Sequence, residues 1–448
     1  MDTTSLWSHW QELLDPFRIA FTAPGWDHFV TWITGLALNV EEHTITQSLV
    51  GLDRPQDWKG LETFAETGAW KSPLFDVNLA LLIDEAPGSL WYGYRVWACD
   101  DTKVHRTSKD VWGTCTFHEY TARCPNRATT VRAHNWVVLG RLLENGEHPA
   151  WFLPQAARLY FRKSQLPTTP ILETFHTKCE LAVELFRQQT GYFPGKHLAV
   201  FDGGFAFRSV VRPLVLPEGG RPRIEFLTRL RHDGRLCRLP PAKKPPGQHG
   251  RKARWGRRLP PPRQGGRWPG KWQEGDAFIY GRKRHVRWKE VICLWRVLGH
   301  EVPVKAVVAE VEGYTKRFHL VSSAMPLTGL QMVELFAARF RQEDGFRDLK
   351  QRLGWEECRA WTKNPIERTT LALFVTMSLL RLLQFRLDKS GVADWWMPPP
   401  WNPHKDRPSV LDVERLLRRN RTGMQAGLSA LLGDDEKAVE EGGEAKGM

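Results

Sequence analysis

The chain has 448 residues, which is too long for one ordinary domain and predicts two to four structural units. Lys and Arg number 64 against 50 Asp and Glu, and the net charge of +14 favours a polyanionic partner over the small-molecule metabolism of an acidic enzyme. Residues 221–290 hold 21 Lys or Arg and five Asp or Glu, a net charge of +16, so the remaining residues sum to −2. Such clustering is typical of nucleic-acid binding, although a solvated basic loop has the same composition.

The seven Cys are scattered and form no C-x-x-C pair, so neither a zinc framework nor a disulfide scaffold is expected. This usage predicts a reducing, cytoplasmic compartment. The N-terminus has an early acid and no apolar core, which argues against a signal peptide. The longest apolar run, 371–380, is too short to span a bilayer. We therefore expect it to form a buried helix, and we expect no membrane partner.

Residues 1–88 are predicted to form an N-terminal helical domain, because apolar residues such as Trp7, Trp10 and Leu14 recur at helical spacing. Residues 1–88 contain no candidate catalytic or metal-binding motif. This domain could either pack against the rest of the chain or bind the DNA end.

Residues 89–215 predict an α/β layer, the first part of a catalytic core. Strand-like runs lie at 94–102, 130–142 and 197–201, and a helix is expected at 171–190.

Residues 216–320 predict a basic, mainly β insertion domain around a loop rich in Pro and Gly at 240–270. Its expected strands lie at 223–230, 277–280, 291–298 and 302–310. Helix returns over 321–400, the second part of the core. Residues 401–448 predict a helix followed by an acidic tail that is disordered from Gly433.

Two acids lie at the ends of predicted strands: Asp101 closes the first, and Asp202 directly follows the third. Functional groups gather at the carboxyl ends of strands in open α/β sheets. Carboxylates suit Mg²⁺ or Mn²⁺, and two such ions can activate a water and stabilise the leaving oxygen of a phosphodiester. Either acid alone also suits a turn or a helix cap.

Four residues of a predicted helix, Phe336, Arg339, Glu343 and Lys350, fall within a wedge of roughly 60° at about 100° per residue. An acid between two cations suits a metal ion beside phosphates. A surface ladder of ion pairs has the same spacing, because Arg339, Glu343 and Arg347 are four residues apart.

The spacing Phe336-(2)-Arg339-(3)-Glu343-(6)-Lys350 resembles the Y-(2)-R-(3)-E-(6)-K signature of DDE transposases from bacterial insertion sequences. Asp101, followed by Thr, resembles the first acid of that family. Asp202, after His-Leu-Ala-Val-Phe and before Gly-Gly, resembles the second. The likeness extends from the helical block to about residue 383. Phe336 departs from the signature Tyr, and the hydrogen bond of its hydroxyl is lost.

The resemblance implies an RNase H-like catalytic core, interrupted by the β insertion, that nicks the ends of an insertion sequence and transfers the new 3′-hydroxyl. It implies that Asp101, Asp202 and Glu343 are catalytic and hold Mg²⁺, as two ions, with Mn²⁺ able to substitute. Arg339, Lys350 and Phe336 would contact DNA. Asp100 and Asp344 adjoin two of the acids, but the residue before Thr fits the first position better, and Asp344 lies about 100° further round the helix.

Basic residues of the insertion are expected to neutralise phosphates of double-stranded DNA without reading bases. They are Arg251, Lys252, Arg254, Arg257, Arg258, Arg282, Lys283, Arg284 and Arg287. Interleaved Trp side chains suit either stacking on unpaired bases or the insertion's own core. The resemblance also implies a homodimer on DNA and a location at the nucleoid.

Two alternatives stay open. The chain could be a DNA-binding protein derived from a transposase that no longer cuts, or another metal nuclease on an RNase H-like fold. The catalytic hypothesis predicts that Asp101, Asp202 and Glu343 converge in the fold.

Overall fold

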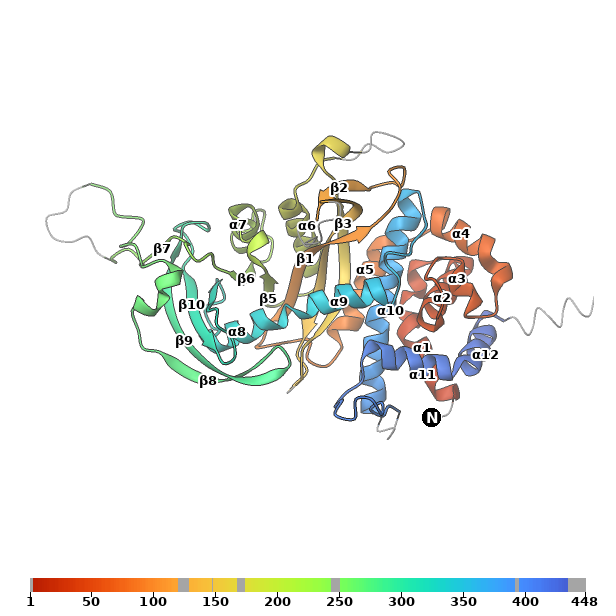
Figure 1. Ribbon diagram of the computed structural model, residues 1–448. Helices are drawn as coiled ribbons and strands as arrows, with labels where there is room; N and C mark the ends of the chain where they lie inside the picture. Colours follow the sequence, from red (N-terminus) through yellow and green to blue (C-terminus); the bar gives the residue numbers. More distant parts are fainter. Residues whose placement is uncertain are drawn as a thin grey trace, which may run out of the picture.

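A computed structural model describes residues 3–119, 129–146, 148–166, 174–242, 250–390 and 395–433. Within this part of the chain, eleven strands form one mixed sheet, flanked by helices on both faces (Figure 1). The strands are β1 (Arg95–His105), β2 (Cys115–His118), β3 (Thr130–Leu143), β4 (Trp151–Tyr160), β5 (His197–Phe201), β6 (Ile224–Arg229), β7 (Leu236–Cys237), β8 (Gln273–Ile279), β9 (Arg282–Trp295), β10 (Val304–Val311) and β11 (Phe318–Ser322).

The centre of the sheet has the order β4-β3-β1-β5-β6. Strand β1 pairs antiparallel with β3 and parallel with β5, and β5 pairs parallel with β6. Beyond β6 the strands β11, β10 and β9 follow, all antiparallel to their neighbours, and β7 and β8 both pair with β9. The strands from the predicted insertion at 216–320 therefore continue the same sheet, and β6 lies directly beside β5.

Helices cover the sheet on two sides. Helices α6 and α7 pack on β3, β4 and β6, whereas α8, α9 and α10 pack on the other face, and the remaining helices surround α10 (Figure 1). The helices are α1 (Thr3–Leu14), α2 (Ala23–Leu38), α3 (Gln47–Val50), α4 (Trp58–Thr67), α5 (Ser72–Asp84), α6 (Lys178–Thr190), α7 (Arg208–Val215), α8 (Gly329–Ala338), α9 (Arg341–Gln351), α10 (Lys363–Lys389), α11 (Val410–Arg419) and α12 (Arg421–Leu432).

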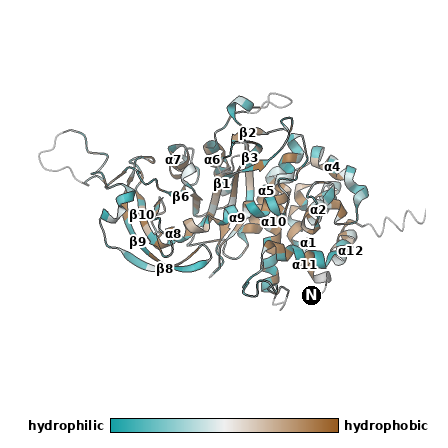
Figure 2. Ribbon diagram, viewed as in Figure 1, coloured by the Kyte–Doolittle hydropathy of each residue, from teal (hydrophilic) through white to brown (hydrophobic). Residues whose placement is uncertain are grey.

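Strand β1 is buried on both faces because its side chains alternate between the two layers. Val96 and Ala98 belong to the hydrophobic cluster shared with α10, and Trp97 and Cys99 belong to the cluster shared with α6. Figure 2 shows hydrophobic ribbon in the central strands and α10, and hydrophilic ribbon in α9. Helix α9 therefore lies at the border between core and solvent.

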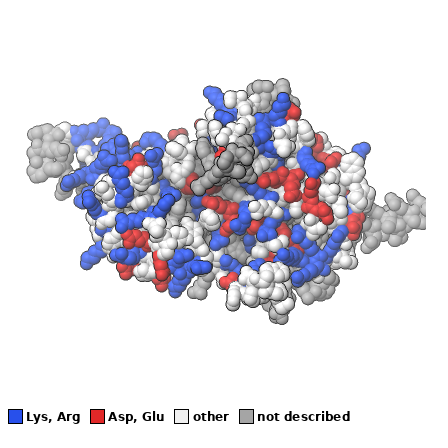
Figure 3. Space-filling model, viewed as in Figure 1, with Lys and Arg blue, Asp and Glu red and all other residues white. Residues whose placement is uncertain are grey.

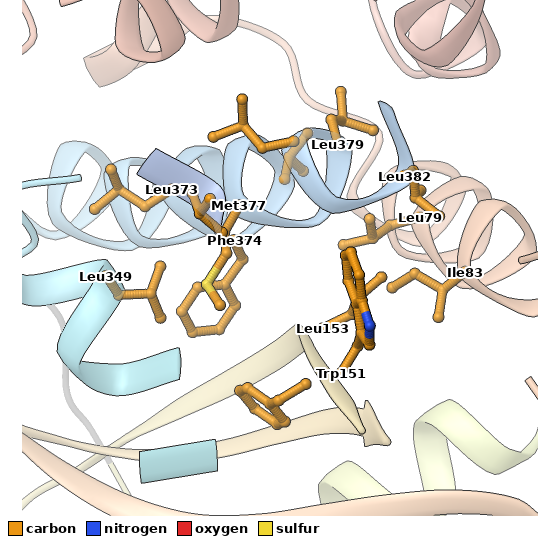
Figure 4. Close-up of a cluster of buried hydrophobic side chains, with 14 of the residues drawn as sticks. Leu79, Ile83, Trp151, Leu153, Leu349, Leu373, Phe374, Met377, Leu379 and Leu382 are labelled. Carbon is orange, nitrogen blue, oxygen red and sulfur yellow. The ribbon is translucent and has the colours of Figure 1, made fainter. Parts of the chain in front are cut away.

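Helix α10 is the central helix of the apolar layer and packs against β4, α2 and α4. Its Leu373, Phe374 and Met377 lie between Leu349 of α9 and Trp151 of β4 (Figure 4). Burial of each such side chain contributes about 1.5–3 kcal/mol. The helix is long and apolar enough to cross a membrane by length and composition, but 78% of its most apolar window is buried inside the protein. The prediction of a buried helix at 371–380 is confirmed.

Two predicted elements differ from the fold. Strand β4 was not expected, because Pro154 interrupts its sequence. The strand tolerates this residue because Pro154 lies opposite Gly140, where the pairing with β3 shifts register. The single helix expected over 336–350 is interrupted after Ala338, where Phe340 donates to the carbonyl of Ala337 in a tighter turn.

Some predictions fall outside the described residues. The expected disordered tail lies there from residue 434, as do residues 243–249 of the basic loop and the start of the helix expected at 171–190. The described part of that helix, α6, begins at Lys178, where Thr177 and Glu180 form a capping box.

Candidate active site

Two carboxylates share one face of the sheet, Asp100 in β1 and Asp202 directly after β5. The parallel register places Cys99 opposite Phe201, so the next residue of each strand lies beside the other. Cys99 and Phe201 are buried toward α6. Because side chains alternate and the backbone of Asp202 is still extended, both acids face the opposite layer, which holds α8 to α10.

Helix α9 carries Glu343 to this face. The preceding residue, Gln342, is fully buried, and its Nε2 donates to the carbonyl of Val138 in β3 at 3.1 Å. Gly345 permits a close approach to β4, because a Cβ at this position would lie 2.5 Å from the ring of Phe152. These two contacts fix the rotation of the helix and leave the Glu343 side chain 49% exposed.

Arg339 joins two of the three acids. Its Nη1 donates to Oδ2 of Asp100 at 2.9 Å, and its Nη2 donates to Oε1 of Glu343 at 3.3 Å. The guanidinium lies 5.8 Å from the ring centroid of Phe336, and the side chain is only 12% exposed. Arg339 therefore links Asp100 to Glu343, while Asp202 lies near Asp100 through the register of β1 with β5.

Burial raises the pKa of Asp100 to about 7. The charge of Arg339 opposes this shift, and the nearby charge of Asp202 adds to it. A carboxyl group with such a pKa is only partly ionised near neutral pH, and a further cation beside it would favour the charged form.

Asp101, predicted as the first acid, lies on the other face of β1. Its Oδ2 accepts from Nζ of Lys178, at the start of α6, at 2.6 Å. In the corrected amide orientation Asn135 also donates to this oxygen at 3.1 Å. The Asp101 side chain therefore contacts α6, on the face of β1 opposite to Asp100, because adjacent residues of a strand point to opposite faces. Its role as the first catalytic acid stays a prediction. Asp100, which the sequence argument set aside, occupies the shared face.

The other residues of the helical signature have separate environments. Asp344 points away from Glu343 and accepts from Arg341 at 2.6 Å and from Arg347 at 3.0 Å. Phe336 is 9% exposed and packs in the core. Nζ of Lys350 donates to the carbonyl of Lys103 in β1 at 2.5 Å, and burial lowers its pKa. Lys350 is therefore near β1, whereas Phe336 offers little surface to a ligand.

A hairpin tip near the acids was not singled out from the sequence. Tyr280 joins β8 to β9 with a φ of 49°, and its ring centroid lies 5.6 Å from that of Phe340, the residue after Arg339. Burial raises the pKa of Tyr280, and the charges of Arg339 and Glu343 also act on it. The Tyr-Gly pair between two strand-like runs is a turn signal that could have located this tip.

The predicted DNA-binding cations gather in two places on the outer strands, which Figure 3 shows as a largely blue end of the molecule. Arg251, Lys252, Arg254, Arg257 and Arg258 are exposed in the segment between β7 and β8. Arg282, Lys283, Arg284 and Arg287 lie on β9.

Some of these side chains have protein partners. Arg287 pairs with Glu274 at 2.8 Å and with Glu310 at 3.3 Å, and Arg284 lies over the ring of Tyr314. Of the interleaved Trp residues, Trp268 and Trp288 are buried in the core of this region.

The carboxylates beside Arg339 are of the kind that binds divalent cations. Within the described ranges, no three His, Cys, Asp or Glu side chains are arranged so as to hold a metal ion. Asp100 and Asp202 nevertheless present hard carboxylate oxygens on one face, the chemistry that Mg²⁺ prefers. Glu343 would complete the set, and the guanidinium of Arg339 lies between it and Asp100. These carboxylates are the type of ligand that a divalent cation binds, and Arg339 would compete with such a cation for Asp100 and Glu343.

A family model described as DDE superfamily endonuclease matches residues 21–297 of the chain. The match contains β1 and β5, and with them Asp100, Asp101 and Asp202, and it ends before Glu343. No curated protein matches the chain.

Proposed function

The chain belongs to the DDE superfamily endonuclease family, and on that basis we propose that it is a DNA transposase of a bacterial insertion sequence. DNA is the substrate class of this family, and its enzymes generally use divalent metal ions. In the proposed reaction the enzyme hydrolyses a phosphodiester at each end of the element. The new 3′-hydroxyl then attacks a phosphodiester of the target strand, which joins the element to the target and releases the target's own 3′-hydroxyl. The observation that carries the proposal is that Arg339 links Asp100 of β1 to Glu343 of α9, while the strand register places Asp202 beside Asp100.

The strand order supports an RNase H-like core. Three antiparallel strands, β4, β3 and β1, are followed by the parallel pair β5 and β6, with helices on both faces. The proposed insertion then lies between the second and third acids, as in the transposases that the sequence resembles. We take it to run from β7 to β11, since β6 completes the core sheet.

Asp100 is proposed as the first acid in place of Asp101. It shares its face with Asp202, and Arg339 links it to Glu343. Asp101 instead pairs with Lys178 and serves to hold the start of α6 against β1.

The proposed cofactor is Mg²⁺, with Mn²⁺ able to substitute, held as two ions by Asp100, Asp202 and Glu343. When bound, such ions activate a water molecule and stabilise the leaving oxygen of the phosphodiester. With Arg339 as its cationic neighbour, Asp100 has a pKa of about 7, so part of the Asp100 population is protonated near neutral pH. That part would have to lose its proton before Asp100 could hold a metal ion. Arg339, once displaced from Asp100, is positioned to donate to a phosphate oxygen, and its planar fork suits that partner.

Substrate binding is assigned to two sets of cations: the exposed ones between β7 and β8, from Arg251 to Arg258, and those of β9, from Arg282 to Arg287. Their side chains would neutralise phosphates without reading bases. A homodimer on DNA and a location at the nucleoid are part of the proposal. The alternative, a DNA-binding protein that no longer cuts, is not favoured, because all three acids are present.

The test is a cleavage assay on DNA that flanks the coding sequence, with Mg²⁺ and with EDTA. Glu343→Gln should abolish Mg²⁺-dependent cleavage and leave DNA binding within about twofold, because only the reacting centre is changed. Glu85→Gln is the control, since Glu85 is an exposed acid at the end of α5 and belongs to neither the proposed site nor the basic segment. Full cleavage by the Glu343 variant would exclude the proposed site.

A further inference from the structure

A cavity of about 220 Å³ lies beside the proposed active site, between α9, α10, β4 and the segment before α11. It is on the flank of α9 that carries Asp344 and Asp348, away from Glu343. Five arginines line it, namely Arg341, Arg347, Arg352, Arg381 and Arg407.

The carboxylates of the cavity do not balance these cations. Asp344 accepts from both Arg341 and Arg347, at 2.6 and 3.0 Å. Asp348 lies 3.1 Å from Arg352 and 3.9 Å from Arg381. With only these two Asp in the lining, the five arginines leave an excess of three positive charges.

Arg381 shows how closely the cations are gathered. Its guanidinium stacks 4.5 Å from the ring centroid of Trp151, and its side chain is 19% exposed. Burial lowers its pKa to about 10, and the like charges of Arg407, Arg341 and Arg352 act in the same direction. Buried like charges repel strongly, so an anion placed among them would be stabilised.

A third acid, Glu414, lies close enough for its charge to interact with Arg352 and Arg381, but burial raises its pKa to about 7. It is therefore only partly ionised near neutral pH. Asp406, next to Arg407 in the chain, lies outside the lining, but its charge also acts on Arg407. Counted with the two Asp of the lining, it leaves the five arginines an excess of two positive charges for an external ligand. Arginine forks match the tetrahedral oxygens of a phosphate group and are well suited to bidentate contacts.

We propose that this arginine pocket binds a backbone phosphate of the DNA strand that is held in the catalytic site. The inference rests on the proposed function. A helix with its side chains is about 10–12 Å wide. A strand that crosses α9 from Glu343 to the pocket would therefore place there a phosphate about three nucleotides from the cut, at about 3.4 Å per nucleotide. Binding of this phosphate would fix the position of the DNA strand along its length relative to the catalytic acids.

The experiment measures binding of a fluorescent duplex from the DNA flanking the coding sequence, in EDTA and over a range of salt concentrations. Arg347 is 56% exposed, so Arg347→Gln changes the pocket at its rim. Arg407→Gln changes a half-buried side chain on the segment before α11. Arg359→Gln is the matched control, because Arg359 is 70% exposed and pairs with Glu42 elsewhere on the surface. Each pocket variant should bind several-fold more weakly, and the slope of log K against log salt should fall by about one.

Equal affinity and equal salt slope for wild type and both pocket variants would overturn the inference while leaving the proposed function intact. Failure of the wild type itself to bind the duplex would instead reject the proposed function. A second arm replaces the duplex with inorganic phosphate and follows thermal unfolding. Stabilisation by phosphate that is lost in Arg407→Gln, together with unchanged duplex binding, would show that the pocket takes a free anion and would also overturn the inference.

Position provides a further check. Single methylphosphonate substitutions along the bound strand remove one charge at a time. The wild type should lose affinity at one phosphate about three nucleotides from the cleavage position, and Arg407→Gln should be insensitive at that phosphate. A loss that is the same for wild type and variant at every position would contradict the assignment.

Discussion

The guanidinium of Arg339 lies 2.9 Å from the carboxylate of Asp100 and 3.3 Å from that of Glu343, so one cation links an acid of β1 to an acid of α9. The ion pair with Asp100 offsets the repulsion between Asp100 and the nearby charge of Asp202. In the proposed function Arg339 would compete with a metal ion for Asp100, and this ion pair would have to open before Asp100 could serve as a ligand.

The first prediction separates the two neighbouring aspartates. Asp100→Asn should reduce Mg²⁺-dependent cleavage by at least about a thousandfold, because a ligand on the shared face is lost. Asp101→Asn should retain cleavage within about tenfold, since it removes only the partner of Lys178. The measurement is the cleavage rate of each variant and of the wild type at saturating DNA. Loss of activity in Asp101→Asn at unchanged thermal stability would contradict the assignment.

The second prediction concerns Arg339. Arg339→Gln removes the competitor of the metal ion and also a phosphate donor. We expect the Mg²⁺ concentration for half-maximal cleavage to fall, and the maximal rate to fall by about ten- to a hundredfold. Arg339→Lys should keep part of the rate, because it retains the charge without the fork. A titration of cleavage against Mg²⁺ distinguishes the two effects, and an unchanged midpoint would exclude competition.

The third prediction addresses the basic segment from Arg251 to Arg258. Replacing its five cations by Gln should weaken duplex binding and lower the slope of log K against log salt by up to about four, at about 0.9 per phosphate contact. The control is Arg421→Gln. Arg421 lies in α12, outside the basic segment, and pairs with Asp53. If the slope of log K against log salt equals that of the wild type, the segment from Arg251 to Arg258 does not contact DNA phosphates.

The fourth prediction is a pH dependence of stability. Glu414 is 1% exposed, and burial raises its pKa to about 7 from an ordinary value near 4.5. The folded state therefore binds a proton more tightly than the unfolded state. The resulting stability is fully present below pH 4.5 and is lost as the pH rises through 7.

Glu414→Gln removes this dependence. Relative to the wild type, its free energy of unfolding should rise between pH 5 and 8 by an amount on the order of 2–3 kcal/mol. Urea unfolding at the two pH values measures the change, with Glu41→Gln as the exposed control. A difference between variant and wild type that is the same at both pH values would contradict the raised pKa.

Local patterns were sufficient for several elements. The apolar run before Asp202 predicted β5, since a short run that ends at Asp-Gly-Gly is typical of a buried strand. The spacing of Arg339 and Glu343 predicted that they meet on one helical face, and they form an ion pair despite the break after Ala338. Strand β4 escaped prediction because Pro154 is allowed only by a register shift at Gly140, which depends on another strand.

The sequence by itself determined which residue types are available to the site: adjacent acids at Asp100 and Asp101, one acid after β5, and a Glu beside an Arg on a helix. Only the tertiary structure decided which of the adjacent acids belongs to the site. Both faces of β1 are buried, so its hydrophobic pattern does not distinguish them. The choice depends on the register of β1 with β5 and on the face that α9 covers, and both are contacts between residues far apart in the chain.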